Sequence, residues 1–223
     1  MEDYLSESEQ WERVKAWMRT NGTWIVAGVA LGVLGLTGWN WWQARQERLN
    51  LEAASRYEEI LKALDRGDKT RALTLTGELE RDYASSPYVD QAHLVGARVA
   101  VEASELDKAA SLLKGVMEKS KDSQLSLIAR LRLARVQLAQ NKPDEALATL
   151  NGAQPGAFAA RFSEVRGDIL LAKGDKAGAL KEYEMARAGT ATQTVDARTL
   201  DLKIGDLETE PPAATPAPVA EAN

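Results

Sequence analysis

An uncharged run of 25 residues constrains this chain more than any other feature of its sequence. The run extends from Thr20 to Ala44 without a single Asp, Glu, Lys or Arg, whereas 27% of the whole chain is charged. As a helix it would measure about 37 Å at ~1.5 Å per residue, and the hydrocarbon core of a bilayer is about 30 Å thick. The run therefore predicts one transmembrane helix over residues 20–44.

Two other interpretations of the run are a buried core helix and a cleaved signal peptide. A core helix rarely needs this length, and one near a terminus has few neighbours to cover all its faces. A signal peptide has a shorter apolar segment followed by a small-residue cleavage site, whereas this run ends in Trp39, Trp41 and Trp42. Trp24 lies near its other end, so indole rings stand where two membrane interfaces are expected. We therefore expect an uncleaved anchor.

Three glycines give the predicted anchor one smooth face. Gly28, Gly32 and Gly35 recur at i, i+4 and i+7, which places them on one side of a helix. Such a face packs against a second helix in some membrane proteins. Glycine is also enriched in spanning helices generally, so packing against a membrane partner is one of two interpretations.

Composition excludes several classes of function. A net charge of −5 and the lack of a dense basic cluster argue against nucleic-acid binding. The absence of Cys excludes disulfides, thiol catalysis and iron–sulfur ligation. Basic residues precede and follow the run in nearly equal numbers, so the positive-inside rule does not orient the helix.

An internal repeat follows the anchor. The phrases "RGDKTRAL" and "KGDKAGAL" each place an alanine shortly after a polar turn, and similar phrases lie between them. The alanines of the series are spaced 37, 37 and 33 residues apart, namely Ala72, Ala109, Ala146 and Ala179. A period near 34 residues with Gly-Asp at the turn is typical of tetratricopeptide repeats. One unit cannot bury its apolar face alone, so we expect an all-α solenoid of about four helix pairs rather than an irregular bundle. The three extra residues of the first two units predict longer turns there.

These patterns divide the chain into five segments. Residues 1–19 are a short tail, 20–44 the membrane helix and 45–189 the tetratricopeptide-like domain. Leu200, Ile204 and Leu207 predict a C-terminal capping helix within residues 190–207, because the open end of a solenoid needs a cover. Four of the seven prolines and no aromatic residue follow, so residues 208–223 predict a disordered Pro/Ala-rich tail.

The sequence carries no recognisable catalytic, metal or cofactor motif. A Gly-x-Ser-x-Gly elbow, a phosphate loop and a His-Glu-x-x-His helix are all missing. The only histidine, His93, lies in the helical stretch "VDQAHLVGARVA" and is better interpreted as a packing residue than as a ligand. We therefore expect no enzyme, no metal and no cofactor.

A protein-binding groove is the remaining candidate for function. If the first helix of each pair lines the concave side of a solenoid, equivalent positions should share one strip. These positions are Leu94, Arg98 and Val101, then Leu131, Arg135 and Leu138, then Glu164, Asp168 and Leu171. The charged positions allow two interpretations, which are not exclusive. Arg135 pairs with Asp168 between repeats, or the strip is a mixed apolar and charged groove for peptide segments.

Several stretches also resemble a known family. The anchor stretch "GVALGVLGLTGW", with "LRLARVQLAQ", "RGDILLAKGDKAGA", "LDLKIGDL" and the acidic N-terminal tail, is similar to the bacterial YfgM family of single-pass inner-membrane proteins. The resemblance covers roughly residues 1–207 and implies a cytoplasmic N-terminus and a periplasmic repeat domain. It also implies an ancillary role at the SecYEG translocon, passing emerging client polypeptides to periplasmic chaperones such as PpiD. It identifies no binding residues.

Two rival functions stay open beside this adaptor role. One is a membrane-tethered repeat protein that serves as a chaperone in cytochrome c maturation, with a groove for haem-attachment peptides. The other, which the missing motifs disfavour, is an unrecognised enzyme.

Overall fold

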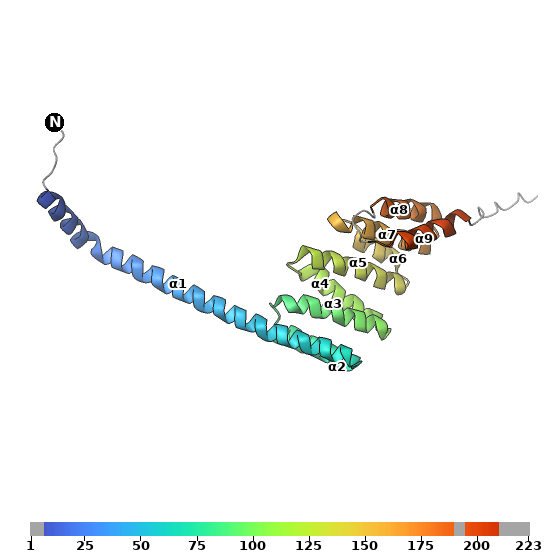
Figure 1. Cartoon of the computed structure of the whole chain (residues 1–223), viewed down its shortest axis with the longest axis horizontal. Helices are drawn as coiled ribbons and strands as arrows, with labels where there is room; N and C mark the ends of the chain where they lie inside the picture. Colours follow the sequence, from blue (N-terminus) through green and yellow to red (C-terminus); the bar gives the residue numbers. More distant parts are fainter. Residues whose placement is uncertain (1–6, 190–194, 210–223) are drawn as a thin grey trace, which may run out of the picture. The chain divides into compact units, whose positions relative to one another are not determined.

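The computed structural model describes residues 7–189 and 195–209, and every regular element in these residues is a helix. The helices are drawn in Figure 1. In chain order they are α1 (Glu7–Asp65), α2 (Lys69–Asp82), α3 (Pro87–Glu102), α4 (Leu106–Lys119), α5 (Ser123–Ala139), α6 (Pro143–Leu150), the 3₁₀ turn η1 (Gly156–Phe158), α7 (Ala159–Ala172), α8 (Lys176–Ala188) and α9 (Ala197–Thr209). The predicted all-α class is confirmed.

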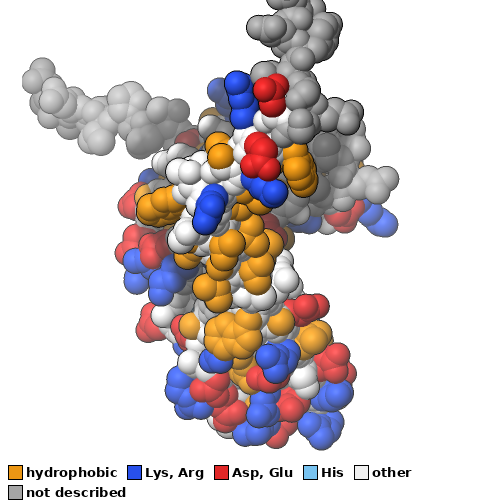
Figure 2. Space-filling model, turned by 90° about the vertical axis from the view of Figure 1, so that its left-hand side faces the viewer, with side chains coloured by type: hydrophobic (Ala, Val, Ile, Leu, Met, Phe, Trp, Pro, Cys, Tyr) orange, Lys and Arg blue, Asp and Glu red, His pale blue; other side chains and the backbone are white. Residues whose placement is uncertain are grey.

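The chain divides into two compact units, residues 1–55 and residues 56–223. The described part of the first unit, residues 7–55, is the larger part of helix α1 and contains the uncharged run, while the last turns of α1 belong to the second unit. Within the described residues, α1 is the one helix long and apolar enough to cross a membrane, and none of its apolar window is buried in the protein. Figure 2 faces the left-hand side of Figure 1, and hydrophobic side chains gather across the middle of that view with charged ones above and below.

Two polar side chains of the uncharged run are hydrogen-bonded to their own helix. The hydroxyl of Thr37 donates to the carbonyl of Val33 at 2.8 Å, and the amide of Asn21 donates to the carbonyl of Trp17 at 3.1 Å. Such bonds remove the cost of placing a polar group in hydrocarbon, where no water can serve as partner. These two polar groups are therefore compatible with a membrane span.

The structure extends the helix beyond the predicted anchor at both ends. Residues 7–19, predicted as a tail, are helical, and residues 1–6 lie outside the described part. At the other end α1 continues to Asp65, two residues before Gly67, because no glycine or proline interrupts the chain after Gly38. The three glycines of the smooth face have open space around them in the isolated chain. Their packing against a membrane partner stays a prediction.

In the second unit, one turn geometry recurs four times. Each turn has three residues and connects the two helices of a pair, namely α1 to α2, α3 to α4, α5 to α6 and α7 to α8. The middle residue of each turn has a positive φ of 60–83°, a backbone region that favours glycine. In every turn the next N–H donates to the carbonyl five residues earlier at 2.8–2.9 Å, which closes the end of the preceding helix. The four positive-φ residues are Gly67, Ser104, Asn141 and Gly174.

The repeated alanines occupy the same position in each helix pair. Each is the fourth residue of the helix that follows the turn, and each is at most 1% exposed. A side chain limited to one methyl group lets two helices approach closely. The alanines that marked the repeat, Ala72, Ala109, Ala146 and Ala179, are therefore buried at equivalent positions, and the predicted four helix pairs are confirmed.

The predicted longer turns in the first two units are wrong. The turns within the pairs are identical in length, and the longest described connection between pairs, residues 151–158, falls inside the shorter 33-residue spacing. The additional residues of the 37-residue spacing lengthen helices instead. Helix α5 has 17 residues whereas α7 has 14, because an added helical turn extends an existing packed face without altering the turn chemistry.

Neighbouring pairs share their hydrophobic cores. One cluster joins α3, α4 and α5, a second joins α5, α6 and α7, and a third joins α7, α8 and α9. Leu200 and Ile204 of α9 are buried in the third cluster, and Leu207 packs against it. These are the three residues that predicted a capping helix. Of the predicted disordered tail, Glu208 and Thr209 belong to α9, and residues 210–223 lie outside the described part.

Candidate protein-binding surface

The first helices of the pairs carry all the residues of the predicted groove. Leu94 and Arg98 lie on α3, Leu131, Arg135 and Leu138 on α5, and Asp168 on α7. Helix α5 packs against both α3 and α7, so these three helices form a continuous row. The predicted groove residues therefore occupy equivalent positions on neighbouring helices. Not all of their side chains are accessible or paired as predicted.

Two leucines of the predicted groove are core residues. Leu94 is 8% exposed and Leu131 is 5% exposed, and each belongs to the cluster shared with the next pair. Both side chains are packed inside these clusters and are therefore not available to a bound peptide. Leu138 packs against the second of these clusters and is partly exposed. The most exposed aliphatic side chains of this register are Val101, 42% exposed, and Leu171, 38% exposed.

The predicted pair between Arg135 and Asp168 does not form. Nη2 of Arg135 lies 3.5 Å from Oε2 of Glu164, one helical turn before Asp168 on α7. Asp168 instead accepts a hydrogen bond from the Tyr183 hydroxyl at 2.9 Å and one from Nζ of Lys203 at 2.6 Å. An arginine reaches either of two carboxylates one turn apart, and here Asp168 is already occupied by α8 and α9.

Glu164 is the centre of a buried ionic network. Its residue is only 6% exposed, and its carboxylate lies 2.9 Å from Arg161, 3.4 Å from Lys203 and 3.5 Å from Arg135. A buried carboxylate is tolerated only with such partners, because desolvation of an unpaired charge is costly. The network joins α5, α7 and α9, so it holds the capping helix to the last two repeats.

Tyr183 completes this network from α8. Its ring is fully buried, and Nζ of Lys203 lies 5.3 Å from the ring centroid. Burial, followed by the hydrogen bond to Asp168 and the negative charges of Asp168 and Glu164, raises the pKa of the Tyr183 hydroxyl above its usual value. Sequence reasoning missed Lys203 because it lies 35 residues from Asp168 in a helix recognised only as a cap.

Arg98 has a partner on its own helix. Its Nε lies 3.0 Å from Glu102, and Nζ of Lys69 approaches the other oxygen of that carboxylate at 2.9 Å. Arg132, which the sequence analysis did not select, donates from Nη1 to the carbonyl of Leu94 at 3.5 Å and so bridges α5 and α3. Its role is hard to predict from the sequence, because it lies one residue away from a predicted groove leucine rather than at a groove position.

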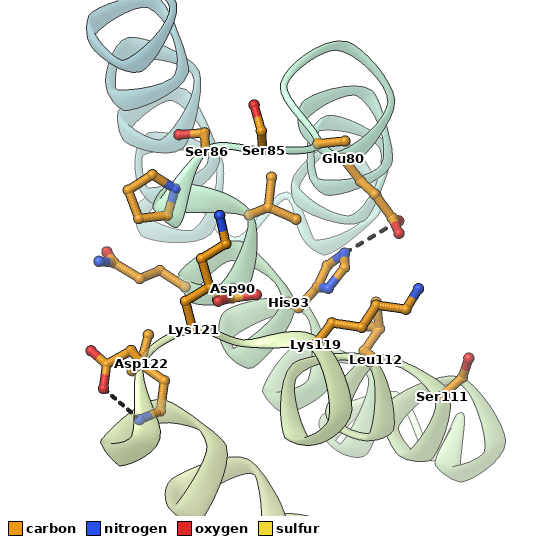
Figure 3. A pocket seen from close by; sticks show the side chains of 16 residues that line it. Glu80, Ser85, Ser86, Asp90, His93, Ser111, Leu112, Lys119, Lys121 and Asp122 are labelled. Carbon is orange, nitrogen blue, oxygen red and sulfur yellow. Dashed lines mark hydrogen bonds and ion pairs between the residues drawn. The ribbon is translucent and has the colours of Figure 1, made fainter. Parts of the chain in front are cut away.

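The lone histidine borders a pocket at the other end of these helices. The pocket has a volume of about 780 Å³ and lies between the ends of α2 and α4 and the beginnings of α3 and α5 (Figure 3). His93 is buried, and its Nε2 lies 3.2 Å from Oε2 of Glu80 without the alignment of a hydrogen bond. Lys119, Lys121 and Asp90 also line the pocket, so positive and negative groups are mixed. Across residues 7–189 and 195–209 no group of three metal-ligating side chains occurs.

Comparison with solved structures supports the repeat architecture. A structure of BtubC from P. vanneervenii superimposes with a TM-score of 0.56 and covers 73% of this chain and 82% of that one. MamA from Desulfovibrio magneticus RS-1 superimposes with a TM-score of 0.51 over 70% of this chain and 93% of that one. Both are 15% identical to this chain, so the likeness concerns the fold alone.

Sequence relatives extend the likeness to the whole chain. A protein of Escherichia coli (strain K12) named "Ancillary SecYEG translocon subunit" is 32% identical over 207 residues, which cover 93% of this chain and 99% of the relative. A protein of the same name from Neisseria gonorrhoeae is 31% identical and covers 93% of this chain and all of the relative. The model of a tetratricopeptide repeat-like domain family matches residues 15–209, which include the uncharged run. The chain therefore belongs to the tetratricopeptide repeat-like family of ancillary SecYEG translocon subunits.

Proposed function

We propose that the protein is a membrane-anchored adaptor at the Sec translocon. In this role its N-terminus lies in the cytoplasm, its repeat domain lies in the periplasm, and it passes emerging polypeptides to a periplasmic chaperone of the PpiD type. The observation that carries the proposal is the match of relatives named as translocon subunits across both the uncharged run and the repeats. Such a subunit is a non-catalytic kind of protein, which agrees with the expectation of no enzyme.

The architecture supports an adaptor in two ways. Helix α1 provides a membrane span, because its exposed apolar side chains are unfavourable in water and favourable in the hydrocarbon core of a bilayer. The stacked pairs provide an extended surface on which successive helices present equivalent residues, and repeat proteins use such surfaces to bind polypeptides. The row formed by α3, α5 and α7 contains the predicted binding residues.

Membrane anchoring is tested by placing charges in the middle of the run. A charged residue at mid-bilayer costs about 2.5–3.5 kcal/mol on insertion scales, so Gly32→Arg combined with Leu34→Arg should release the protein from carbonate-washed membranes. The matched control Gly32→Ala with Leu34→Val keeps the run apolar and should stay in the membrane. Recovery of the unmodified full-length chain in the soluble fraction would contradict the anchor.

Orientation is tested with single cysteines, since the natural chain has none. A membrane-impermeant maleimide applied to spheroplasts should label Ala148→Cys, which lies exposed on α6. Ser8→Cys, placed before the run, should react only after the cells are lysed. The reverse pattern would place the repeat domain in the cytoplasm and would end the proposed transfer to periplasmic chaperones.

Function at the translocon is tested by capture from the exposed aliphatic positions. A photoreactive residue at Val101 or Leu171 of the full-length protein should crosslink to emerging polypeptides and to a periplasmic chaperone, while the protein co-purifies with SecYEG. Ala148 is the matched control, because it is exposed but lies on a second helix of a pair. Exclusive capture of apocytochromes would favour the cytochrome c maturation role instead.

A further inference from the structure

The row of first helices is locally basic in a chain that is acidic overall. The whole chain carries 28 Lys and Arg against 33 Asp and Glu. Helices α3, α5 and α7, however, together carry six arginines against four carboxylates. The arginines are Arg98, Arg130, Arg132, Arg135, Arg161 and Arg166, and the carboxylates are Asp90, Glu102, Glu164 and Asp168.

Three of these cations lie together where α3 and α5 pack. Arg132 and Arg135 are three residues apart on α5, which places them on neighbouring positions of one helix face. The guanidinium of Arg132 reaches the carbonyl of Leu94 on α3, one turn before Arg98. We call Arg98, Arg132 and Arg135 the arginine strip.

The carboxylates near the strip are already shared. Glu102 lies between Arg98 and Lys69, and Glu164 is approached by Arg135 and two further cations. Arg132 has no carboxylate within ion-pair distance among residues 7–189 and 195–209. Arg132 is exposed at the surface, but partial desolvation of its guanidinium group, followed by the positive charges of Arg98 and Arg135, lowers its pKa. The centre of the strip is therefore short of negative charge.

Aliphatic side chains flank the strip at the same repeat position. Val101 follows Arg98 by three residues, and Leu138 follows Arg135 by three residues. Val101 is exposed and Leu138 partly exposed, each three residues before the positive-φ residue of its turn. The surface thus presents guanidinium groups and aliphatic groups side by side.

We propose that the arginine strip docks a polypeptide segment in which Asp or Glu side chains share one face with aliphatic ones. Carboxylates of the segment enter between Arg98, Arg132 and Arg135, whose planar forks bind them in a bidentate manner. Aliphatic side chains of the segment contact Val101 and Leu138. This inference rests on the proposed adaptor function and names the chemistry of the polypeptides that it selects. A phosphate ligand would use the arginines but not the aliphatic flank.

The experiment measures binding of a short fluorescent peptide, whose Glu and Leu side chains share one face, to the full-length protein in detergent. Arg132→Gln should weaken binding about tenfold, which corresponds to about 1.4 kcal/mol. Arg132→Lys, which keeps the charge but loses the fork, should fall between. Arg81→Gln is the matched control, because this exposed arginine of α2 pairs with its own neighbour Asp82 at 2.8 Å. It should leave the affinity unchanged.

Comparison peptides separate the two chemical features. The same peptide with Gln in place of Glu should bind at least about tenfold more weakly, as should one with Ser in place of Leu. Equal binding of the Gln and Glu peptides, or unchanged binding by Arg132→Gln, would overturn the proposal. Displacement of the peptide by glycerol phosphate but not by acetate would reassign the strip to phosphate headgroups and would also overturn it.

Two controls keep the result interpretable. Arg98→Gln alters an exposed side chain and should weaken binding without unfolding, so the proposal stays testable if Arg132→Gln fails to fold. Co-purification of the same variants with SecYEG is measured in parallel. Lost peptide binding with retained SecYEG supports the strip as a client site, whereas absence of SecYEG from the natural protein would overturn the adaptor function itself.

Discussion

The second and fourth helix pairs fill the same helix crossing with different side chains. In the fourth pair, Gly167 of α7 faces Tyr183 of α8, and a Cβ atom at Gly167 would lie 2.5 Å from the ring. In the second pair the equivalent positions, counted from the turn, hold Ala97 and Leu113, which pack in one cluster. A large ring requires glycine opposite it, whereas a leucine leaves room for a methyl group. The two pairs therefore fill the equivalent crossing with different combinations of side chains.

The two pairs differ in the same way at their turns. The fourth pair has Gly174 at the positive-φ position and Asp175 as a helix cap, whose side chain accepts from the N–H of Gly178 at 2.9 Å. The second pair has Ser104 at a φ of 61°, and Glu105 makes no capping bond with its side chain. One backbone geometry is thus formed with a favourable sequence in one pair and an unfavourable sequence in the other. Stability should follow these differences.

The largest expected effect is at the alanine that all four pairs share. Ala179→Leu inserts a larger side chain into a fully buried crossing, and overpacking of this kind should cost about 3 kcal/mol. Ala148→Leu, at an exposed position of α6, should change the melting temperature of the full-length protein little. Equal melting temperatures for the two variants would show that the alanine register is wrong.

The next largest effect tests whether the two residues at this helix crossing compensate each other in volume. Gly167→Ala should cost about 2 kcal/mol, because the added methyl group meets the Tyr183 ring. Adding Tyr183→Leu recreates the Ala–Leu combination of the second pair and should recover part of that loss, as seen by denaturant unfolding. Additive losses in the double variant would refute the idea that the two positions compensate each other.

A smaller effect concerns the hydroxyl that the fourth pair has and the second lacks. Tyr183→Phe removes the hydrogen bond to Asp168 and should cost about 1 kcal/mol. Because the folded protein raises the pKa of Tyr183 above its usual value of 10.0, its contribution is complete below pH 10 and is lost as pH rises further. Melting temperatures measured across this range should therefore fall more steeply in the natural protein than in Tyr183→Phe. Parallel curves would count against this assignment.

The smallest effect is a gain in stability at the turns. Ser104→Gly should stabilise the second pair by about 0.5–1 kcal/mol, because a positive φ is strained for serine but not for glycine. Asn141→Gly should gain less, since asparagine adopts this conformation more readily. The reverse change, Gly174→Ala, should lower the melting temperature. A loss of stability in Ser104→Gly would mean that its side chain contributes more than its backbone strain removes.

Much of the fold was predictable because its signals are local. The uncharged run and each Gly-Asp turn are continuous stretches of sequence, and the alanines recur at a nearly regular interval, so none of these signals depends on contacts between distant residues. The helix class, the four pairs and the buried alanines followed from them. The length of the turns was mispredicted, since a changed repeat period does not say whether a turn or a helix has absorbed the added residues.

The candidate binding residues were less predictable because their contacts cross between helices. The sequence by itself determined which residues occupy equivalent positions, including Arg98, Arg135 and Asp168. Only the tertiary structure decided that Leu94 and Leu131 are buried, that Arg135 pairs with Glu164, and that Lys203 reaches Asp168 from the capping helix. The physical reason is the length of these side chains: a guanidinium or ammonium group reaches carboxylates on several turns, and the offset between packed helices decides which one it meets. The same offset gathers Arg132 with two other arginines, although no spacing along the chain marks it.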